Sequence, residues 1–168
     1  MSHGPRYRLK PRRRREGMTD YRKRLSLLRS NKTRMVVRKT NKQIVVQFVE
    51  YKEDGDRIIA QAISKELKSK FNWKYPVSNT PSAYLTGILA TNRAKEKGVK
   101  ECVLDIGRQR PVTGSNVFAS LKGALDIGIN CPHSPEKLPS NDRINGKHID
   151  DKLPSEVEKI KNKITGGK

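Results

Sequence analysis

Positive charge is concentrated at one end of this chain. Residues 1–40 hold 15 Lys and Arg side chains against 2 Asp and Glu, a net charge of +13 out of +20 for all 168 residues. The segment also has few apolar side chains and carries two glycines and two prolines, so it cannot bury enough surface to fold alone. We therefore predict a basic arm over residues 1–33, ordered by a partner, and a folded body that begins at Arg34.

Three runs rich in β-branched residues follow the arm, at 35–37, 44–51 and 58–63. Such runs are typical of strands. Short polar segments separate them, and the second of these contains Asp54-Gly55. Asp-Gly is a strong hairpin signal because glycine accepts a positive φ. The pattern predicts a three-stranded antiparallel meander.

Helical patterns come after the meander. Residues 64–71 favour a short helix, because apolar side chains four positions apart share one face. Thr80 and Pro81 supply an N-cap and a proline at the first helical position of a longer helix. A third helix is predicted to begin after a cap at Ser115 or Asn116.

A buried strand predicted at 102–106 lies between the two longer helices and decides the topology. The order strand, helix, strand, helix predicts parallel additions to the sheet, and 129–131 offers one further short strand. We therefore expect an α/β core over 34–131, with the meander extended by parallel strands into a mixed sheet packed with helices. Residues 132–168 are predicted to form an irregular, Pro-containing extension with a short helix at 155–164.

Several classes of protein are excluded by composition. No apolar run approaches the roughly 20 residues that span a bilayer, and the N-terminus has no apolar signal core, so we expect a cytosolic protein. Cys102 and Cys131 are the only cysteines, which excludes a disulfide framework. Cys131 and His133 lack the further ligands that a structural zinc site needs, and we expect no cofactor.

The sequence has no convincing catalytic constellation. The segment 107–114 is bounded by glycines but lacks the Gly-Lys-Ser/Thr of a phosphate-binding P-loop. Asp105 is placed as an acid of a two-metal nuclease would be, although no second and third acid joins it. The alternative reading is that Asp105 caps the loop that follows it. We predict that the chain is not an enzyme.

The arm has the chemistry of a nucleic-acid ligand. Arg12–Arg15 suit phosphates, because a guanidinium donates two parallel hydrogen bonds to one phosphate. Tyr7 and Tyr21 can either stack on unpaired bases or anchor the arm to the body. A basic helix over residues 21–29, formed when RNA is bound, would turn Leu25 and Leu28 toward the protein. The candidate RNA-binding residues are Arg6, Tyr7, Arg8, Arg12, Arg13, Arg14, Arg15, Tyr21, Arg22, Lys23, Arg24, Arg29, Lys32, Arg34, Arg108, Gln109 and Arg110.

Several long segments, in a fixed order over most of the chain, resemble one family. Together they are similar to archaeal-type members of the universal large-subunit ribosomal protein eighteen family, the 5S rRNA-binding protein of the central protuberance. The segments are Tyr21-Arg22-Lys23-Arg24, residues 79–87, residues 104–111, residues 121–126 and Pro132-His133-Ser134.

The resemblance implies a three-layer α/β core and a structural role in the large ribosomal subunit in the cytoplasm. The implied partners are 5S rRNA, the large-subunit (23S-type) rRNA and neighbouring proteins of the central protuberance. RNA contacts carry over to Arg12–Arg15, Tyr21–Arg24 and Arg108–Arg110. Two alternatives stay open: a nonspecific nucleic-acid binder, for which charge is sufficient, and a ribonuclease-H-like nuclease at Asp105.

Overall fold

Four strands form one mixed sheet in the computed structural model, which describes residues 4–166. Their spatial order is β3-β2-β1-β4. The first three pair antiparallel, and β4 lies parallel to β1, so the predicted meander with a parallel addition is confirmed. Asn130 makes a single parallel bridge to Glu101 where a further short strand was predicted. The strands are β1 (Arg34–Lys39), β2 (Ile44–Glu50), β3 (Arg57–Ile63) and β4 (Val103–Asp105).

Side chains alternate between the two faces of the sheet, as the pleat of a strand requires. Met35 and Val37 of β1 are fully buried and face the core. Arg34, Val36 and Arg38 alternate with them and therefore point to the opposite face. β1 thus contributes apolar side chains to the core on one face and arginines to the opposite face.

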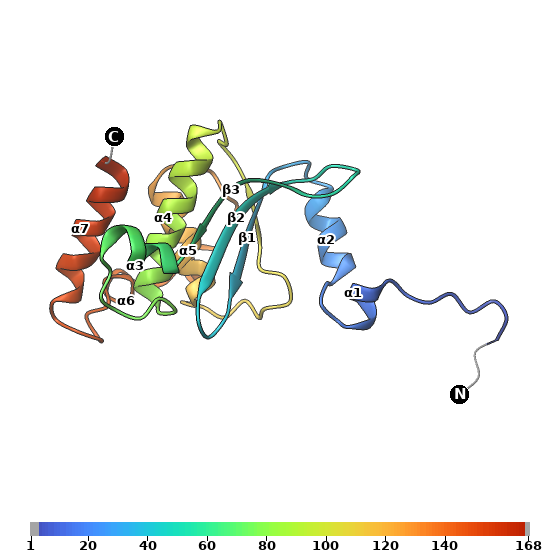
Figure 1. Ribbon diagram of the computed structural model, residues 1–168, viewed down its shortest axis with the longest axis horizontal. Helices are drawn as coiled ribbons and strands as arrows, with labels where there is room; N and C mark the ends of the chain where they lie inside the picture. The colour runs from blue at the N-terminus through green and yellow to red at the C-terminus, as the bar shows by residue number, and fades with distance from the viewer. Residues whose placement is uncertain (1–3, 167–168) are drawn as a thin grey trace.

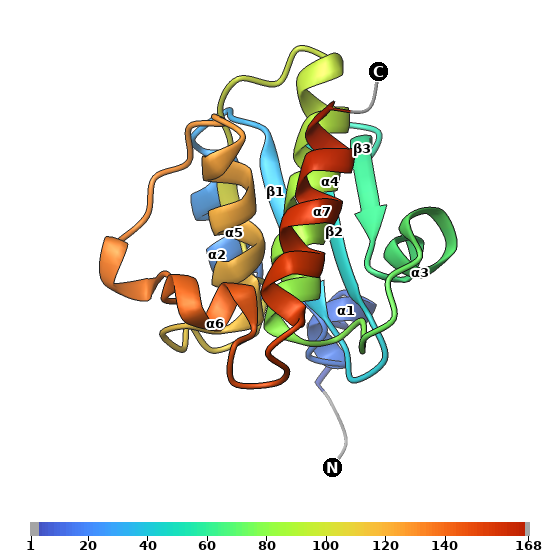
Figure 2. The ribbon, with the colours of Figure 1, turned by 90° about the vertical axis from the view of Figure 1, so that its left-hand side faces the viewer.

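Helices cover one face of the sheet. α3 (Lys65–Phe71) leaves β3, and α4 (Thr80–Glu96) and α5 (Asn116–Asp126) pack side by side against the strands (Figure 2). The cap of α4 is Asn79, one residue before the predicted Thr80, because the Asn79 side chain accepts the N–H of Ser82. Ser115 precedes α5 at its N-cap position.

Two glycines allow α4 and α5 to approach closely. A Cβ added to Gly87 would lie 2.2 Å from the carbonyl oxygen of Ser120, and one added to Gly123 would lie 2.4 Å from that of Tyr84. Neither position has room for a side chain. The two helices therefore meet backbone to backbone, which leaves no space between them.

The C-terminal extension is more ordered than predicted. It contains a short 3-10 helix at Pro135–Lys137, then α6 (Asn141–Asn145) and α7 (Leu153–Gly166). The predicted helix at 155–164 is confirmed, but the expectation of an irregular tail is wrong. α7 packs against α4 and adds an outer helical layer to the core. The buried apolar residues of α7 are Leu153, Val157, Ile160 and Ile164.

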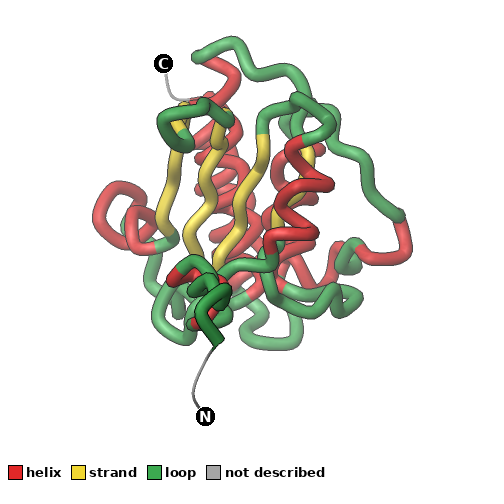
Figure 3. Tube along the Cα trace, turned by 90° about the vertical axis from the view of Figure 1, so that its right-hand side faces the viewer, coloured by secondary structure: helices red, strands yellow, loops and turns green. Residues whose placement is uncertain are grey.

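The arm lies on the other side of the sheet (Figure 1). It contains α1 (Arg12–Arg15) and α2 (Tyr21–Leu28), and Asp20 caps α2 by accepting the N–H groups of Arg22 and Lys23. Seen from the arm side, α2 stands in front of one edge of the sheet and leaves the neighbouring strands uncovered (Figure 3).

The predicted basic helix in the arm is present, but one of its inward contacts is not. Leu25 is exposed, so the prediction that it faces the protein is wrong, whereas Leu27 and Leu28 are half-buried. None of the helices within residues 4–166 combines the length and apolar character that crossing a membrane requires.

Candidate nucleic-acid interface

An ion network runs along the arm-facing side of the sheet, with Arg34 at its centre. The Arg34 side chain is only 3% exposed, and its guanidinium contacts two carboxylates. Nη2 donates to Oδ2 of Asp56 at 2.7 Å, and Nη1 donates to Oδ2 of Asp105 at 3.1 Å. Because both partners come from distant parts of the sequence, Arg34 ties the start of β3 to the end of β4.

Asp105 has a full set of donors. Arg38 donates to its Oδ1 at 2.9 Å and to its carbonyl oxygen at 2.7 Å, and the N–H of Gly107 donates to Oδ1 at 2.8 Å. The bond to Gly107 confirms the reading of Asp105 as the cap of the following loop. Gly107 has a φ of +62°, and a Cβ there would lie 2.9 Å from the Arg38 guanidinium carbon. The loop therefore requires glycine at this position.

Asp56 connects this network to the arm. Its Oδ1 accepts a hydrogen bond from Arg24 of α2 at 2.8 Å. Burial raises the pKa of Asp56, but hydrogen bonds from Arg34 and Arg24 outweigh this and lower it below its ordinary value of 3.8. The carboxylate is thus charged at neutral pH and holds α2 against the strands.

A second contact joins the arm to the loop after β4. Gly17 has a φ of +63°, and a Cβ at that position would lie 2.5 Å from Nη1 of Arg108. Close by, Nε of Arg13 donates to Oγ1 of Thr19 at 3.0 Å. Arg108, predicted as an RNA-binding residue, therefore lies beside the arm although it is about 90 residues away in sequence.

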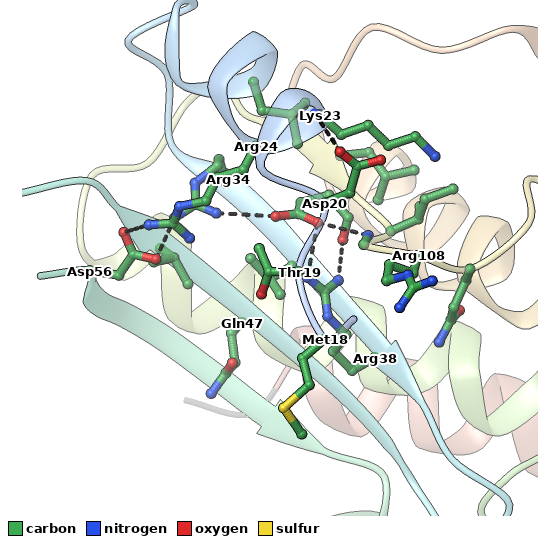
Figure 4. Close-up of a pocket in the computed structure, with 18 of the residues that line it drawn as sticks. Met18, Thr19, Asp20, Lys23, Arg24, Arg34, Arg38, Gln47, Asp56 and Arg108 are labelled. Carbon is green, nitrogen blue, oxygen red and sulfur yellow. Dashed lines mark hydrogen bonds and ion pairs between the residues drawn. The ribbon is translucent and has the colours of Figure 1, made fainter. Parts of the chain in front are cut away.

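A cleft of about 870 Å³ lies between the arm and the sheet. Figure 4 shows Arg24, Arg34 and Asp56 at one end of it, and Arg38 and Arg108 toward the other. Of the predicted RNA-binding residues, those that line it are Arg13, Lys23, Arg24, Arg34, Arg108 and Gln109. On the outer side of the arm, a smaller hollow of about 510 Å³ is lined by Arg14, Tyr21 and Arg22.

Other predicted residues have partners elsewhere. Lys32 pairs with Glu101 at 2.7 Å, and Arg12 pairs with Glu16 at 3.2 Å within the arm. Arg6, Tyr7 and Arg8 lie on the extended start of the arm and are exposed. Arg29 and Arg110 are also exposed. Arg34 differs from all of these, because its burial between two carboxylates leaves it no access to a phosphate.

Sequence reasoning missed several residues of this surface, among them Arg38, Gln47 and Asp56. Arg38 carried one usable signal, since it lies four positions from Arg34 in the same strand, and residues an even number of positions apart share one face. Asp56 directly follows the Asp54-Gly55 turn signal, and nothing local to it indicates its partners, which are 22 and 32 residues away.

The site offers little for metal chemistry. Within residues 4–166, no group of three or more His, Cys, Asp or Glu side chains is placed to hold a metal ion. Asp105, the acid of the nuclease alternative, is bonded to two guanidinium groups and a backbone N–H. A carboxylate so engaged has a structural role.

Comparison with known proteins places the chain in a family. It matches the family described as ribosomal large subunit proteins 60S L5 and 50S L18 over residues 5–100 and 90–134. It is 58% identical over 149 residues to the large ribosomal subunit protein uL18 of Korarchaeum cryptofilum, covering 89% of this chain and 76% of that protein. The corresponding protein of Aeropyrum pernix is 56% identical over 149 residues, with 89% and 70% covered. The chain therefore belongs to the ribosomal large-subunit protein family of 60S L5 and 50S L18.

Proposed function

We propose that this chain binds 5S rRNA through its basic arm and attaches it to the large-subunit rRNA at the central protuberance. The observation that carries the proposal is that most cations of α1 and the start of α2 are not neutralised within the protein. Arg13, Arg14, Arg15, Arg22 and Lys23 have no carboxylate partner among the described residues, whereas Asp56, Glu101 and Asp105 of the body are each paired with a cation. Unneutralised guanidinium groups in a row suit an RNA backbone.

Family membership sets the frame for this proposal. The chain is a ribosomal protein, associated with the large subunit in the cytoplasm, and it is a structural constituent and not an enzyme. Its partners are therefore rRNA and other ribosomal proteins. The choice of 5S rRNA as the specific partner is part of the proposal and is the point to be tested.

The proposed contact set comprises cations and rings of the arm together with three residues of one loop of the body. Arg34 is left out because it is buried. The set is Arg6, Tyr7, Arg8, Arg12, Arg13, Arg14, Arg15, Tyr21, Arg22, Lys23, Arg24, Arg29, Lys32, Arg108, Gln109 and Arg110.

In this mechanism the body supplies orientation and the arm supplies affinity. The ion pair between Arg24 and Asp56 fixes where α2 leaves the sheet, so the cations that precede it reach RNA from a defined position. Each neutralised phosphate releases counterions, which drives binding and reduces repulsion between neighbouring rRNA strands. The segment before α1 has few apolar side chains, and it becomes ordered when it meets RNA.

The experiment replaces Arg12–Arg15 by glutamine and measures 5S rRNA affinity as a function of salt. Losing about four phosphate contacts should weaken binding by about a hundredfold at moderate salt and reduce the salt slope by about 3. The control removes the same charge from exposed lysines of the body, and should bind nearly as the wild type does: Lys65, Lys68, Lys159 and Lys163.

Two results would contradict the proposal. One is equal affinity of the arm variant and the lysine control. The other is displacement of 5S rRNA by an unrelated structured RNA or by DNA at the same concentration, which is the behaviour of a nonspecific binder. The attachment step is tested by pull-down of large-subunit rRNA with tagged 5S rRNA, which should require the chain.

A further inference from the structure

The arm-facing side of the sheet is only partly covered. α2 and the turn that precedes it cross one edge of the strands, and the cleft of about 870 Å³ remains between them. Clefts of roughly 300 to 1,000 Å³ are ordinary for sites that take a small molecule or one unit of a larger one. The cleft therefore has room for a ligand that the described part of the chain does not supply.

The floor and mouth of the cleft are apolar. Val36 and Val49 lie on the strands, and Met18 and Ile58 stand at the mouth with 61% and 49% of their surface exposed. In Figure 4, Met18 and Gln47 both stand over the strands in the open part of the cleft. Gln47 is paired with Val36 across the strands and brings the amide of a neutral side chain to this surface. A flat apolar group with polar edges fits such a floor.

The rim is positively charged. Six basic and three acidic side chains line the cleft, and each acid is already engaged. Asp56 and Asp105 are held by arginines, and Asp20 accepts two N–H groups at the start of α2. Arg13, Lys23 and Arg108 have no carboxylate partner among the described residues, so the mouth has a surplus of cations for an anionic group.

We infer that this cleft binds one unpaired nucleotide of rRNA, with its base against Val36 and Met18 and its phosphate at Arg13, Lys23 and Arg108. The inference rests on the proposed RNA-binding function and deepens it. An unpaired base presents a flat face that stacks on apolar and guanidinium surfaces, whereas a paired base inside a helix does not. A nucleotide combines that face with a phosphate, which matches an apolar floor beside a cationic rim.

The walls of the cleft are held before the ligand arrives. Arg38 lies flat against Gly107 and is fixed by Asp105, while Arg24 and Arg34 are fixed by Asp56. Side chains that are already oriented lose little freedom on binding, so less of the interaction energy is spent on ordering them. The ion network thus serves the cleft as well as the arm.

The first test fills the floor. Val36→Phe places a ring in the cleft, and Val45→Phe is the matched control, because Val45 lies on the same face of the sheet but does not line the cleft. The full chain is mixed with rRNA from the large subunit, including 5S rRNA, and crosslinked by ultraviolet light. Affinity is measured, and the crosslinked peptides and nucleotides are mapped.

The wild type should crosslink to an unpaired nucleotide through a peptide that contains Met18 or Gln47. Val36→Phe should lose this crosslink and bind about tenfold more weakly, the order expected for one stacked base. Val45→Phe should change neither result. Thermal unfolding of both variants checks that each is folded.

A second pair of variants avoids the sheet altogether. Met18→Glu puts a carboxylate at the mouth of the cleft, while Leu9→Glu makes the same change at another exposed residue of the arm. Both positions are in the arm, so the body should fold normally. Met18→Glu should abolish the nucleotide crosslink, and Leu9→Glu should retain it.

The outcomes separate the two proposals. If the wild-type chain binds no rRNA, the proposed function fails. If it binds, but Val36→Phe and Met18→Glu keep both affinity and crosslink, the cleft inference alone is overturned. A crosslink in intact large subunits from Met18 or Gln47 to an acidic segment of another protein would also overturn the cleft inference.

Discussion

Met35 and Val37 of β1 face α4 and α5, whereas Arg34 and Arg38, in the same strand, face the arm. On the helix side, apolar side chains and two glycines bring the backbones together. On the arm side, carboxylates and guanidinium groups meet at set distances and leave a cleft. Apolar contacts have no preferred direction and serve stability, whereas ion pairs fix orientation. The sheet separates a surface built for stability from one built to position an arm.

The largest effect is expected at Arg34, which forms ion pairs on the arm side of the sheet but is as buried as a core residue. Arg34→Met should destabilise the protein by about 3 kcal/mol, because removing one partner leaves the buried charge of Asp105 undercompensated. The free energy of unfolding in urea measures this. A loss of this size would show that Arg34 stabilises the fold in addition to positioning the arm.

The control for Arg34 is Arg38→Met. Arg38 pairs with the same carboxylate but its side chain is 43% exposed, so the loss should be about 1 kcal/mol. The double variant Arg34→Met/Asp105→Leu should recover part of the stability by removing the unpaired charge. Equal losses for Arg34→Met and Arg38→Met would show that burial does not distinguish the two arginines.

Helix packing gives the next largest effect. Gly87→Ala should cost about 2 kcal/mol, because its Cβ would overlap the carbonyl oxygen of Ser120 and push α4 from α5. This loss outweighs the gain in helix propensity of about 1 kcal/mol. Urea unfolding measures the change, and the 5S rRNA affinity of the folded protein should be unaltered.

Gly166→Ala is the matched control for this helix contact, since a Cβ at Gly166 in α7 meets nothing within 4 Å. It should leave stability unchanged or slightly higher. A drop in RNA affinity for Gly87→Ala under conditions where it is fully folded would contradict the separation of the two faces.

The fold was largely predictable because its signals are local. The β-branched runs, the Asp54-Gly55 turn and the proline at the start of α4 each act within a few residues, and the structure places strands and helices there. The tail was misjudged for the opposite reason. Its prolines indicated an irregular segment, but the apolar stripe of α7 finds a partner in α4, some 70 residues away, as in the bond from Asn92 to the carbonyl of Ile164.

The candidate site was less predictable, because its geometry depends on pairs far apart in the chain. Arg34 and Asp105 are 71 residues apart, and composition alone made Arg34 look like any other cation of the arm. The net positive charge of the arm could be predicted directly from the sequence. Which cations are neutralised within the protein, and which remain for RNA, follows only from the topology of the sheet.

Glu66, in α3 on the helix side of the sheet, should give a smaller change in stability that depends on pH. Hydrogen bonds from Arg93, opposed by burial, lower the pKa of Glu66 from 4.5 to about 2. A carboxyl whose pKa is lower in the folded state contributes stability above its unfolded pKa and loses it as pH falls. Stability should therefore decline between pH 4.5 and about 2.

Glu66→Gln should remove this part of the pH dependence and cost about 1 kcal/mol at neutral pH, since one charged hydrogen-bond partner of Arg93 is lost. Urea unfolding at several pH values measures both. Glu158→Gln, at an exposed position of α7, is the control and should keep the decline. An unchanged pH profile for Glu66→Gln would assign the decline to other carboxylates.

Asp56 should give the smallest change in stability and the clearest change in the arm. Its side chain is 28% exposed, and the buried Arg34 keeps Asp105 as a second carboxylate partner, so Asp56→Asn should cost about 1 kcal/mol. Without the charged partner of Arg24, however, α2 is held less firmly, and trypsin should cut the arm faster while the body stays intact. Asp54→Asn, in the same turn and without an ion pair among the described residues, should leave the cutting rate unchanged. If the two variants were cut at equal rates, the ion network would contribute to the sheet alone, and the position of the arm would depend on its contact with Arg108.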